Sequence, residues 1–164
     1  LAAHVEARAG TSFGRLVREL VLGPLGMSGA ALAGPASQGM HGTLRDLAAL
    51  AFELLRPTLL AEPTLAAASA VAFPGLRGVL PGFGLQDPCD WSLGFEVKGS
   101  KRPHWTGTRN HPSTFGHFGG SGAFAWVDPI AGLALVALTD RTFGQWAIEA
   151  WGPFSDLVLE AAGG

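Results

Sequence analysis

The chain has 164 residues, of which 48% are hydrophobic and 15% are charged, and its formal net charge is −2 at pH 7. This length is sufficient for one domain with a buried core, and the composition excludes an intrinsically disordered chain. The slight negative charge gives no attraction to nucleic acid or to an anionic membrane surface. Because the charged fraction is low, we expect apolar surface that something else covers.

The single cysteine, Cys89, cannot form an intrachain disulfide, so the sequence leaves the cellular compartment open. The longest apolar runs, 65–73 and 133–138, are too short to span a membrane. No secretory signal is visible, and the first residue is Leu1 rather than a methionine. We therefore expect the sequence to be part of a longer protein.

Two amphipathic helices are predicted in the first part of the chain. Apolar residues recur with helical spacing over 13–21, and a loop rich in Gly, Ala and Ser follows over 28–42. The second helix begins after Thr43, where Asp46 completes a variant of the capping box, and it ends before Pro57.

The middle of the chain changes from helical to strand patterns. A short helix is predicted over 62–70 with Pro63 in its first turn, and 75–88 is predicted to be a connection because it is rich in glycine and proline. Apolar and polar residues alternate over 91–97, which predicts a half-buried strand. Residues 99–114 are predicted to be irregular.

The last third predicts a hairpin and a closing helix. A strand over 124–127 and a fully buried strand over 133–138 are joined by a turn at 128–132, which favours antiparallel pairing. A helix is predicted over 145–161, interrupted or restarted at Gly152-Pro153.

Helices, then antiparallel strands, then a closing helix indicate the α+β class. We interpret the chain as part of a single domain, with 1–88 mainly helical and 89–164 forming antiparallel strands plus a C-terminal helix. No internal repeat is present.

The most informative segment is Gly116-His117-Phe118-Gly119-Gly120-Ser121-Gly122, directly before a predicted strand. Glycines let a ligand approach the backbone closely, and outward N–H groups can stabilise an oxyanion. The alternative is a bulged strand edge whose glycines make room for a neighbouring helix. Composition by itself leaves both interpretations open.

In its wider context this segment resembles the third conserved box of the serine β-lactamase-like and penicillin-binding-protein-like hydrolases, a family with class C β-lactamase and esterase members. That box is Lys-Thr-Gly, or His-x-Gly in many esterase and peptidase relatives. Pro24-Leu25-Gly26-Met27 is similar to the turn that ends a family helix, and Gly42-Thr43-Leu44-Arg45-Asp46-Leu47-Ala48 resembles the start of the next. With Trp91 to Phe95 before the box, the resemblance covers nearly the whole chain in the right order.

The resemblance implies the C-terminal portion of a partial β-lactamase-like fold, and it implies roles for particular residues. His117 takes the place of the family's Lys or His, contacting the carboxyl or ester group of the substrate, and the N–H of Gly120 is one oxyanion donor. These two are the catalytic candidates, and the candidate substrate-binding residues are Phe118, Gly119, Ser121 and Trp105. The structural alternative for His117 is a neutral imidazole hydrogen-bonded inside the loop.

Two boxes of the family are absent from this sequence. No serine has a lysine three residues later, as Ser-x-x-Lys requires, and the chain has no tyrosine for Tyr-x-Asn. Ser121 lacks the spacing of a nucleophile elbow and is predicted to be a loop or substrate-edge hydroxyl. We therefore predict that the chain is inert alone, and that a missing N-terminal part supplies the nucleophile for hydrolysis of a small-molecule ester, amide or β-lactam through an acyl-enzyme. Histidine in place of lysine favours an esterase or peptidase-like relative.

Two other hypotheses stay open. One is a non-catalytic remnant or binding module that keeps the β-lactamase-like fold, and the other is a metal-binding domain built on His104, His111 and His117. No cysteine or acidic cluster completes a ligand set, so we predict no metal and no cofactor. The resemblance also implies that outer strands of the sheet come from the missing part, so we predict self-association through an unpaired strand edge or apolar face.

Overall fold

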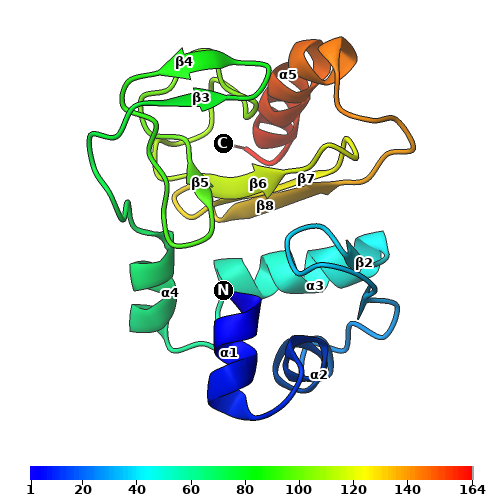
Figure 1. The fold of residues 1–164 in the computed structure, drawn as a ribbon. Coiled ribbons are helices and arrows are strands. Elements are labelled where there is room, and N and C mark those ends of the chain that lie inside the picture. Colours follow the sequence, from blue (N-terminus) through cyan, green and yellow to red (C-terminus); the bar gives the residue numbers. More distant parts are fainter. Residues whose placement is uncertain (164) are drawn as a thin grey trace.

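A four-stranded antiparallel sheet lies at the centre of the computed structural model, which describes residues 1–163. Helix α3 (Leu44–Leu55) covers one face of this sheet and helix α5 (Gln145–Ala161) covers the other (Figure 1). The strands follow one another in the order β5 (Glu96–Val97), β6 (Phe115–Phe118), β7 (Phe124–Asp128) and β8 (Leu133–Ala137). The architecture is α+β, which confirms the predicted class.

The remaining elements lie around these layers. Helices α1, α2 and α4 are on the α3 side of the sheet, and a hairpin of β3 and β4 is on the α5 side (Figure 1). A single π-helical turn continues α2, so the helix predicted over 13–21 is confirmed with a wider last turn. The bounds are α1 (Ala2–Ala9), α2 (Phe13–Val17), η1 (Arg18–Leu22), β1 (Ala31–Leu32), β2 (Met40–His41), α4 (Glu62–Ser69), β3 (Gly78–Leu80) and β4 (Gly84–Gln86).

The capping box predicted for α3 is confirmed. The Asp46 N–H donates to Thr43 Oγ1 at 3.3 Å, and Asp46 Oδ2 accepts the Thr43 backbone N–H at 2.8 Å. Asp46 also accepts the N–H of Gly29 at 3.3 Å, which ties the preceding loop to the helix start. These bonds satisfy N–H groups that the first helical turn leaves unpaired, so the start of α3 is determined locally.

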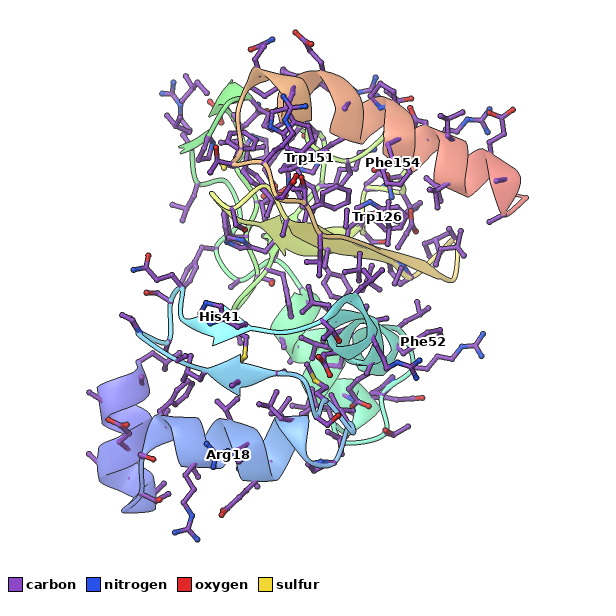
Figure 2. All side chains as sticks on the ribbon, turned by 90° about the vertical axis from the view of Figure 1, so that its right-hand side faces the viewer. Arg18, His41, Phe52, Trp126, Trp151 and Phe154 are labelled. Atoms are coloured by element: carbon purple, nitrogen blue, oxygen red, sulfur yellow. The ribbon has the colours of Figure 1, made fainter. Side chains whose placement is uncertain are left out.

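Each face of the sheet carries its own apolar cluster. Successive side chains of a strand point to opposite faces, so Phe115 and His117 face α3, whereas Phe118 faces α5. In Figure 2, Trp126 and Trp151 lie between the sheet and α5. The cluster on the α5 face is the larger and consists of Leu80, Phe83, Trp105, Phe124, Trp126, Ala147, Trp151 and Leu159. The cluster on the α3 face consists of Val97, Phe115 and Val127, with Leu54, Leu55, Phe95 and Ala134 packed against it.

The region 75–88, predicted to be a connection, contains the β3–β4 hairpin, so that prediction was wrong. Leu80 is 1% exposed and Phe83 is 5% exposed, because both side chains pack into the α5-face cluster. Gly82 in the turn and Gly84 at the start of β4 have φ values of 79° and 82°. The glycines that suggested a loop are those that a tight hairpin turn requires.

The strand predicted over 91–97 is reduced to β5 and one isolated bridge between Trp91 and Glu96. The Ser92 hydroxyl oxygen accepts the N–H of Phe95 at 3.0 Å and closes a turn, and Leu93 is 70% exposed. The prediction was therefore wrong for 91–95, because a side-chain-to-backbone hydrogen bond replaces the ladder.

Two further predictions differ from the structure. Helix α5 runs through Gly152-Pro153 without a break, since Trp151 and Leu159 on its buried face anchor the helix on both sides of the proline. Strand β8 is half-buried along its length rather than fully buried, because only its β7 edge is paired with another strand among residues 1–163.

Candidate functional site

His117 lies exposed on β6, with its backbone paired to Ala125 of β7. Its imidazole packs edge-on against the indole of Trp91, with ring centroids 5.6 Å apart and an interplanar angle of 65°. Trp91 is 37% exposed, so the two rings form part of the molecular surface. The histidine is therefore neither buried in the core nor enclosed within its loop.

An apolar groove runs from His117 between α3 and the sheet. Its volume is about 180 Å³. Nine of its ten lining residues carry no charge or side-chain hydrogen-bonding group, so His117 supplies the polar end of the groove. The lining consists of Leu47, Leu50, Ala51, Leu54, Phe95, Phe115, Gly116, His117, Ala125 and Val127.

A tight glycine turn follows His117 and connects β6 to β7. The N–H of Gly119 donates to the carbonyl of Ala123 at 2.9 Å, and the N–H of Gly122 donates to the carbonyl of Gly119 at 2.9 Å. Gly122 has a φ of 86°, a left-handed backbone conformation that residues other than glycine rarely adopt. Its ideal Cβ would lie 1.9 Å from the carbonyl oxygen of Arg141, so backbone geometry requires glycine here.

Gly120 is at the exposed tip of this turn. Its carbonyl accepts the N–H of Phe143 at 3.0 Å, which anchors the turn to the segment before α5. Its own N–H has no hydrogen-bond partner among residues 1–163. A backbone donor that is held in place and left unpaired can bind an anionic oxygen without first breaking another bond.

Of the six candidate catalytic and substrate-binding residues, the structure brings four together. It separates the side chains of the other two, Phe118 and Trp105, from them. His117, Gly119, Gly120 and Ser121 lie at one end of β6, and Ser121 is exposed there. Phe118 packs against the rings of Phe83, Phe143 and Trp151, and Trp105 is 1% exposed in the same cluster. Both side chains lie on the α5 face, whereas the groove at His117 lies on the α3 face, so neither lines that groove.

Trp91 is the residue of this site that sequence reasoning missed. The alternating pattern over 91–97 predicted only that Trp91 belongs to a half-buried strand, and the contact with His117 depends on the turn at Ser92 and Phe95. The available signal was its position shortly before the irregular segment that leads to the histidine.

A buried charged cluster holds β5 beside β6. Glu96, paired across the ladder with Gly116, accepts hydrogen bonds from His104 Nε2 and Trp105 Nε1, each at 2.8 Å, and forms an ion pair with Lys101. Burial raises the pKa of Glu96, but the hydrogen bonds and charges of His104 and Lys101 outweigh it and hold that pKa below its usual value. Burial lowers the pKa of His104, which favours a neutral imidazole donating to the carboxylate.

The three histidines considered as metal ligands lie in separate environments. His104 belongs to the Glu96 cluster, His111 Nδ1 is 2.7 Å from the Ser113 hydroxyl, and His117 lies on the groove. Within residues 1–163 no group of three or more His, Cys, Asp or Glu side chains is arranged to hold a metal ion. None of the helices in the same range has the length and apolarity needed to cross a membrane.

Several solved structures are similar to this chain, and three of them are described here by name. A β-lactamase (Mb2281c) from Mycobacterium bovis is 52% identical with a TM-score of 0.95, over 99% of this chain and 61% of that one. Unliganded simvastatin synthase (LovD) from Aspergillus terreus is 14% identical with a TM-score of 0.71, over 98% of this chain and 52% of that one. EstCE1, a hydrolase with promiscuous acyltransferase activity, is 18% identical with a TM-score of 0.68, over 98% of this chain and 53% of that one.

The chain thus spans between half and two thirds of the length of these proteins. A search among curated proteins finds no match. The sequence model of the β-lactamase family matches residues 1–153, which is most of the chain. The fold is that of a serine hydrolase of this type, and the chain belongs to the β-lactamase family.

Proposed function

We propose that this chain supplies the C-terminal part of the active site of a serine hydrolase that cleaves an ester, amide or β-lactam through an acyl-enzyme. In this proposal the N–H of Gly120 donates to the oxyanion that forms when the substrate carbonyl is attacked. His117 contacts the acyl or carboxyl part of the substrate, and the backbone from Gly119 to Ser121 lies along it.

The observation that carries the proposal is the unpaired N–H of Gly120, which the β6–β7 turn holds in place three residues after the exposed His117. Oxyanion stabilisation depends on donors that are in place before the reaction, because reorienting them during the reaction costs free energy. The hydrogen bonds at Gly119, Gly122 and the Gly120 carbonyl hold this donor from both sides. A strand bulge that only made room for a helix would have no need for an outward donor.

The nucleophile and its base come from an upstream segment in this proposal. This chain has no Ser-x-x-Lys, and the 52%-identical β-lactamase chain extends well beyond the part that this chain matches. The groove volume of about 180 Å³ is below the roughly 300 Å³ at which small-molecule sites begin. An upstream segment that covers the groove and brings a serine next to His117 completes the site.

Histidine at this position favours an ester over a β-lactam. A histidine presents a ring N–H in place of the compact ammonium of the Lys-Thr-Gly box, the group whose charge pairs with the carboxylate of a β-lactam. The relative from Mycobacterium bovis is called a β-lactamase, so both substrate classes belong in the assay.

The test uses the full-length gene product, extended upstream of Leu1. It should be labelled by a fluorophosphonate on a serine upstream of Leu1 and should hydrolyse p-nitrophenyl esters faster than the β-lactam nitrocefin. Absence of a labelled serine there would leave the non-catalytic binding module as the function.

A matched pair of variants tests the Gly120 donor. Gly120→Pro deletes the N–H and should lower kcat about 100- to 1000-fold, the usual cost of losing one oxyanion donor. Gly120→Ala keeps the N–H and adds a Cβ that meets no atom within 4 Å, so it should lose at most a few-fold. Equal activity of the two variants, each shown to be folded by circular dichroism, would exclude this role for Gly120.

The isolated chain is proposed to self-associate with a second copy. The outer edge of β8 pairs with no other strand of residues 1–163. Beside it, α3 presents Leu44 at 54% and Phe52 at 66% exposure, and Phe52 points outward in Figure 2. An unpaired edge next to apolar side chains favours pairing between copies. A concentration-independent monomer in sedimentation, without bound hydrophobic dye, would contradict this proposal.

A further inference from the structure

A second cavity lies on the α5 side of the sheet, the opposite side from His117 and α3. Its volume is about 340 Å³, within the range of small-molecule sites. One wall is apolar and comes from Phe83, Pro103, Ile148, Gly152 and Pro153. The other wall is polar and comes from the irregular segment after β5, including Lys98, Lys101, Arg102, His104, Thr106 and Thr108. None of these residues takes part in the proposed hydrolysis.

Lys98 is the unusual member of the polar wall. It is 7% exposed, and its ammonium donates a hydrogen bond to the carbonyl of Asn110, its one hydrogen-bond partner within the described range. No carboxylate of residues 1–163 lies within ion-pair distance of it. An ammonium has three donors, and a buried cation without an adjacent anion is costly. Burial, reinforced by the positive charge of Arg102, lowers the pKa of Lys98.

The neighbouring carboxylates are already engaged elsewhere. Asp156 Oδ2 accepts the Thr108 hydroxyl at 2.9 Å and Asp156 Oδ1 accepts the N–H of Arg109 at 2.7 Å, which holds this carboxylate at the rim of the cavity. Glu96 is committed to Lys101 and His104. Asp128, whose charge also reaches Lys98, accepts the N–H of His111 and the hydroxyl of Thr114. None of these three acids is therefore free to move towards the Lys98 ammonium.

Arg102 adds a second cation to the cavity wall. It is exposed and makes no hydrogen bond or ion pair with any other residue that the structure describes. Lys101 is neutralised by Glu96, so Lys98 and Arg102 face Asp156, the one other carboxylate among the lining residues. Outside the lining, Asp128 acts on Lys98 and Arg109 acts on Asp156, and these two opposite charges cancel. The wall is left with one positive charge in excess.

We propose that this cavity is a binding site for a small organic monoanion, a carboxylate with an apolar body. The carboxylate lies between the Lys98 ammonium and the Arg102 guanidinium, and the body packs on Phe83, Ile148 and Pro153. One negative charge matches the excess charge of the wall, and the apolar lining disfavours phosphate or another fully hydrated anion. The site is independent of the proposed hydrolase chemistry.

The test measures binding of 4-phenylbutyrate to the full-length gene product by titration calorimetry, with 4-phenylbutanamide as the uncharged analogue of the same shape. The carboxylate should bind at least about tenfold more tightly than the amide, since only the carboxylate pairs with a desolvated cation. Equal affinities, or no heat of binding for either compound, would overturn the proposal.

Three variants locate the site. Lys98→Met and Arg102→Glu should each weaken binding of 4-phenylbutyrate about fivefold or more. Arg45→Glu, an exposed change on α3 with the same effect on net charge as Arg102→Glu, should leave the affinity within twofold. Arg102 is on the surface, so its variant decides the question even where Lys98→Met fails to fold. Unchanged affinity of Arg102→Glu, or an equal loss in Arg45→Glu, would refute this location.

Discussion

Replacing Gly122 by alanine is the most direct test of the turn that presents the Gly120 N–H. Gly122 combines a φ of 86° with close packing, because its ideal Cβ lies 1.9 Å from the Arg141 carbonyl oxygen and 2.8 Å from Thr139 Cγ2. Gly120, two residues earlier in the same turn, has open space at its Cβ position and is not in the left-handed region. Comparing Gly122→Ala with Gly120→Ala therefore shows whether the backbone geometry at Gly122, rather than the loss of any glycine from the turn, determines the effect.

The expected cost of Gly122→Ala has two parts. Placing alanine in the left-handed region costs about 1 kcal/mol or somewhat more. Relieving the contact with the Arg141 carbonyl requires moving backbone by more than an ångström, and overpacking of this kind costs roughly 1–3 kcal/mol. The free energy of unfolding should therefore fall by about 2–4 kcal/mol, whereas Gly120→Ala should change it by less than about 0.5 kcal/mol.

Urea unfolding monitored by tryptophan fluorescence measures both variants. With a slope of about 2 kcal/mol per molar urea, the midpoint of Gly122→Ala should drop by about 1–2 M. The reasoning is refuted if Gly122→Ala unfolds at the wild-type midpoint, or if Gly120→Ala loses as much as Gly122→Ala. In the full-length enzyme, Gly122→Ala should also reduce kcat, because the turn carries the proposed oxyanion donor.

Three further perturbations probe the buried charges. Asp128 is fully buried and accepts hydrogen bonds from the N–H of His111 at 2.8 Å and from the hydroxyl of Thr114 at 2.9 Å. Asp128→Asn should therefore lower the free energy of unfolding in urea by about 3 kcal/mol. A loss below about 1 kcal/mol would contradict the role of Asp128 in holding the loop before β6. Burial opposes ionisation of Glu53, but donors from Thr58, Leu59 and Leu60 lower its pKa from 4.5 to about 2. Its contribution to stability is therefore complete above pH 4.5 and lost as the pH falls towards 2. Glu53→Gln should flatten the acid limb of a stability-against-pH profile. Glu96→Gln leaves the Lys101 ammonium buried without its counter-charge and should lower the free energy of unfolding by about 3–5 kcal/mol. Adding Lys101→Met in the same chain should restore part of this stability. Additive losses in this double-mutant cycle would show that the two groups are not coupled.

The parts of the fold that the sequence predicted correctly depend on neighbours in the chain. The start of α3 follows from the Thr43 and Asp46 capping box, and the β7–β8 hairpin follows from the turn at 128–132, where Asp128 accepts the N–H groups of Ile130 and Ala131. These hydrogen bonds join residues two or three apart, so a short stretch of sequence contains all the information that they need.

In the candidate site, too, the sequence predicted what depends on neighbouring residues, and the tertiary structure decided the rest. The sequence identified the histidine and the glycine turn, because they lie together in one continuous stretch from Gly116 to Gly122. The tertiary structure decided which face each side chain occupies: His117 with Trp91 on the α3 face, and Phe118 with Trp105 on the α5 face.

Distant contacts also decided the β3–β4 hairpin and the burial of Lys98. Leu80 and Phe83 form a hairpin because α5, more than 60 residues later, covers them. Lys98 is buried because it donates to the carbonyl of Asn110, twelve residues later, and lies in a cavity that α5 helps to line. Hydrophobic burial and charge pairing act between groups that are close in space, and no local pattern records which distant groups those are.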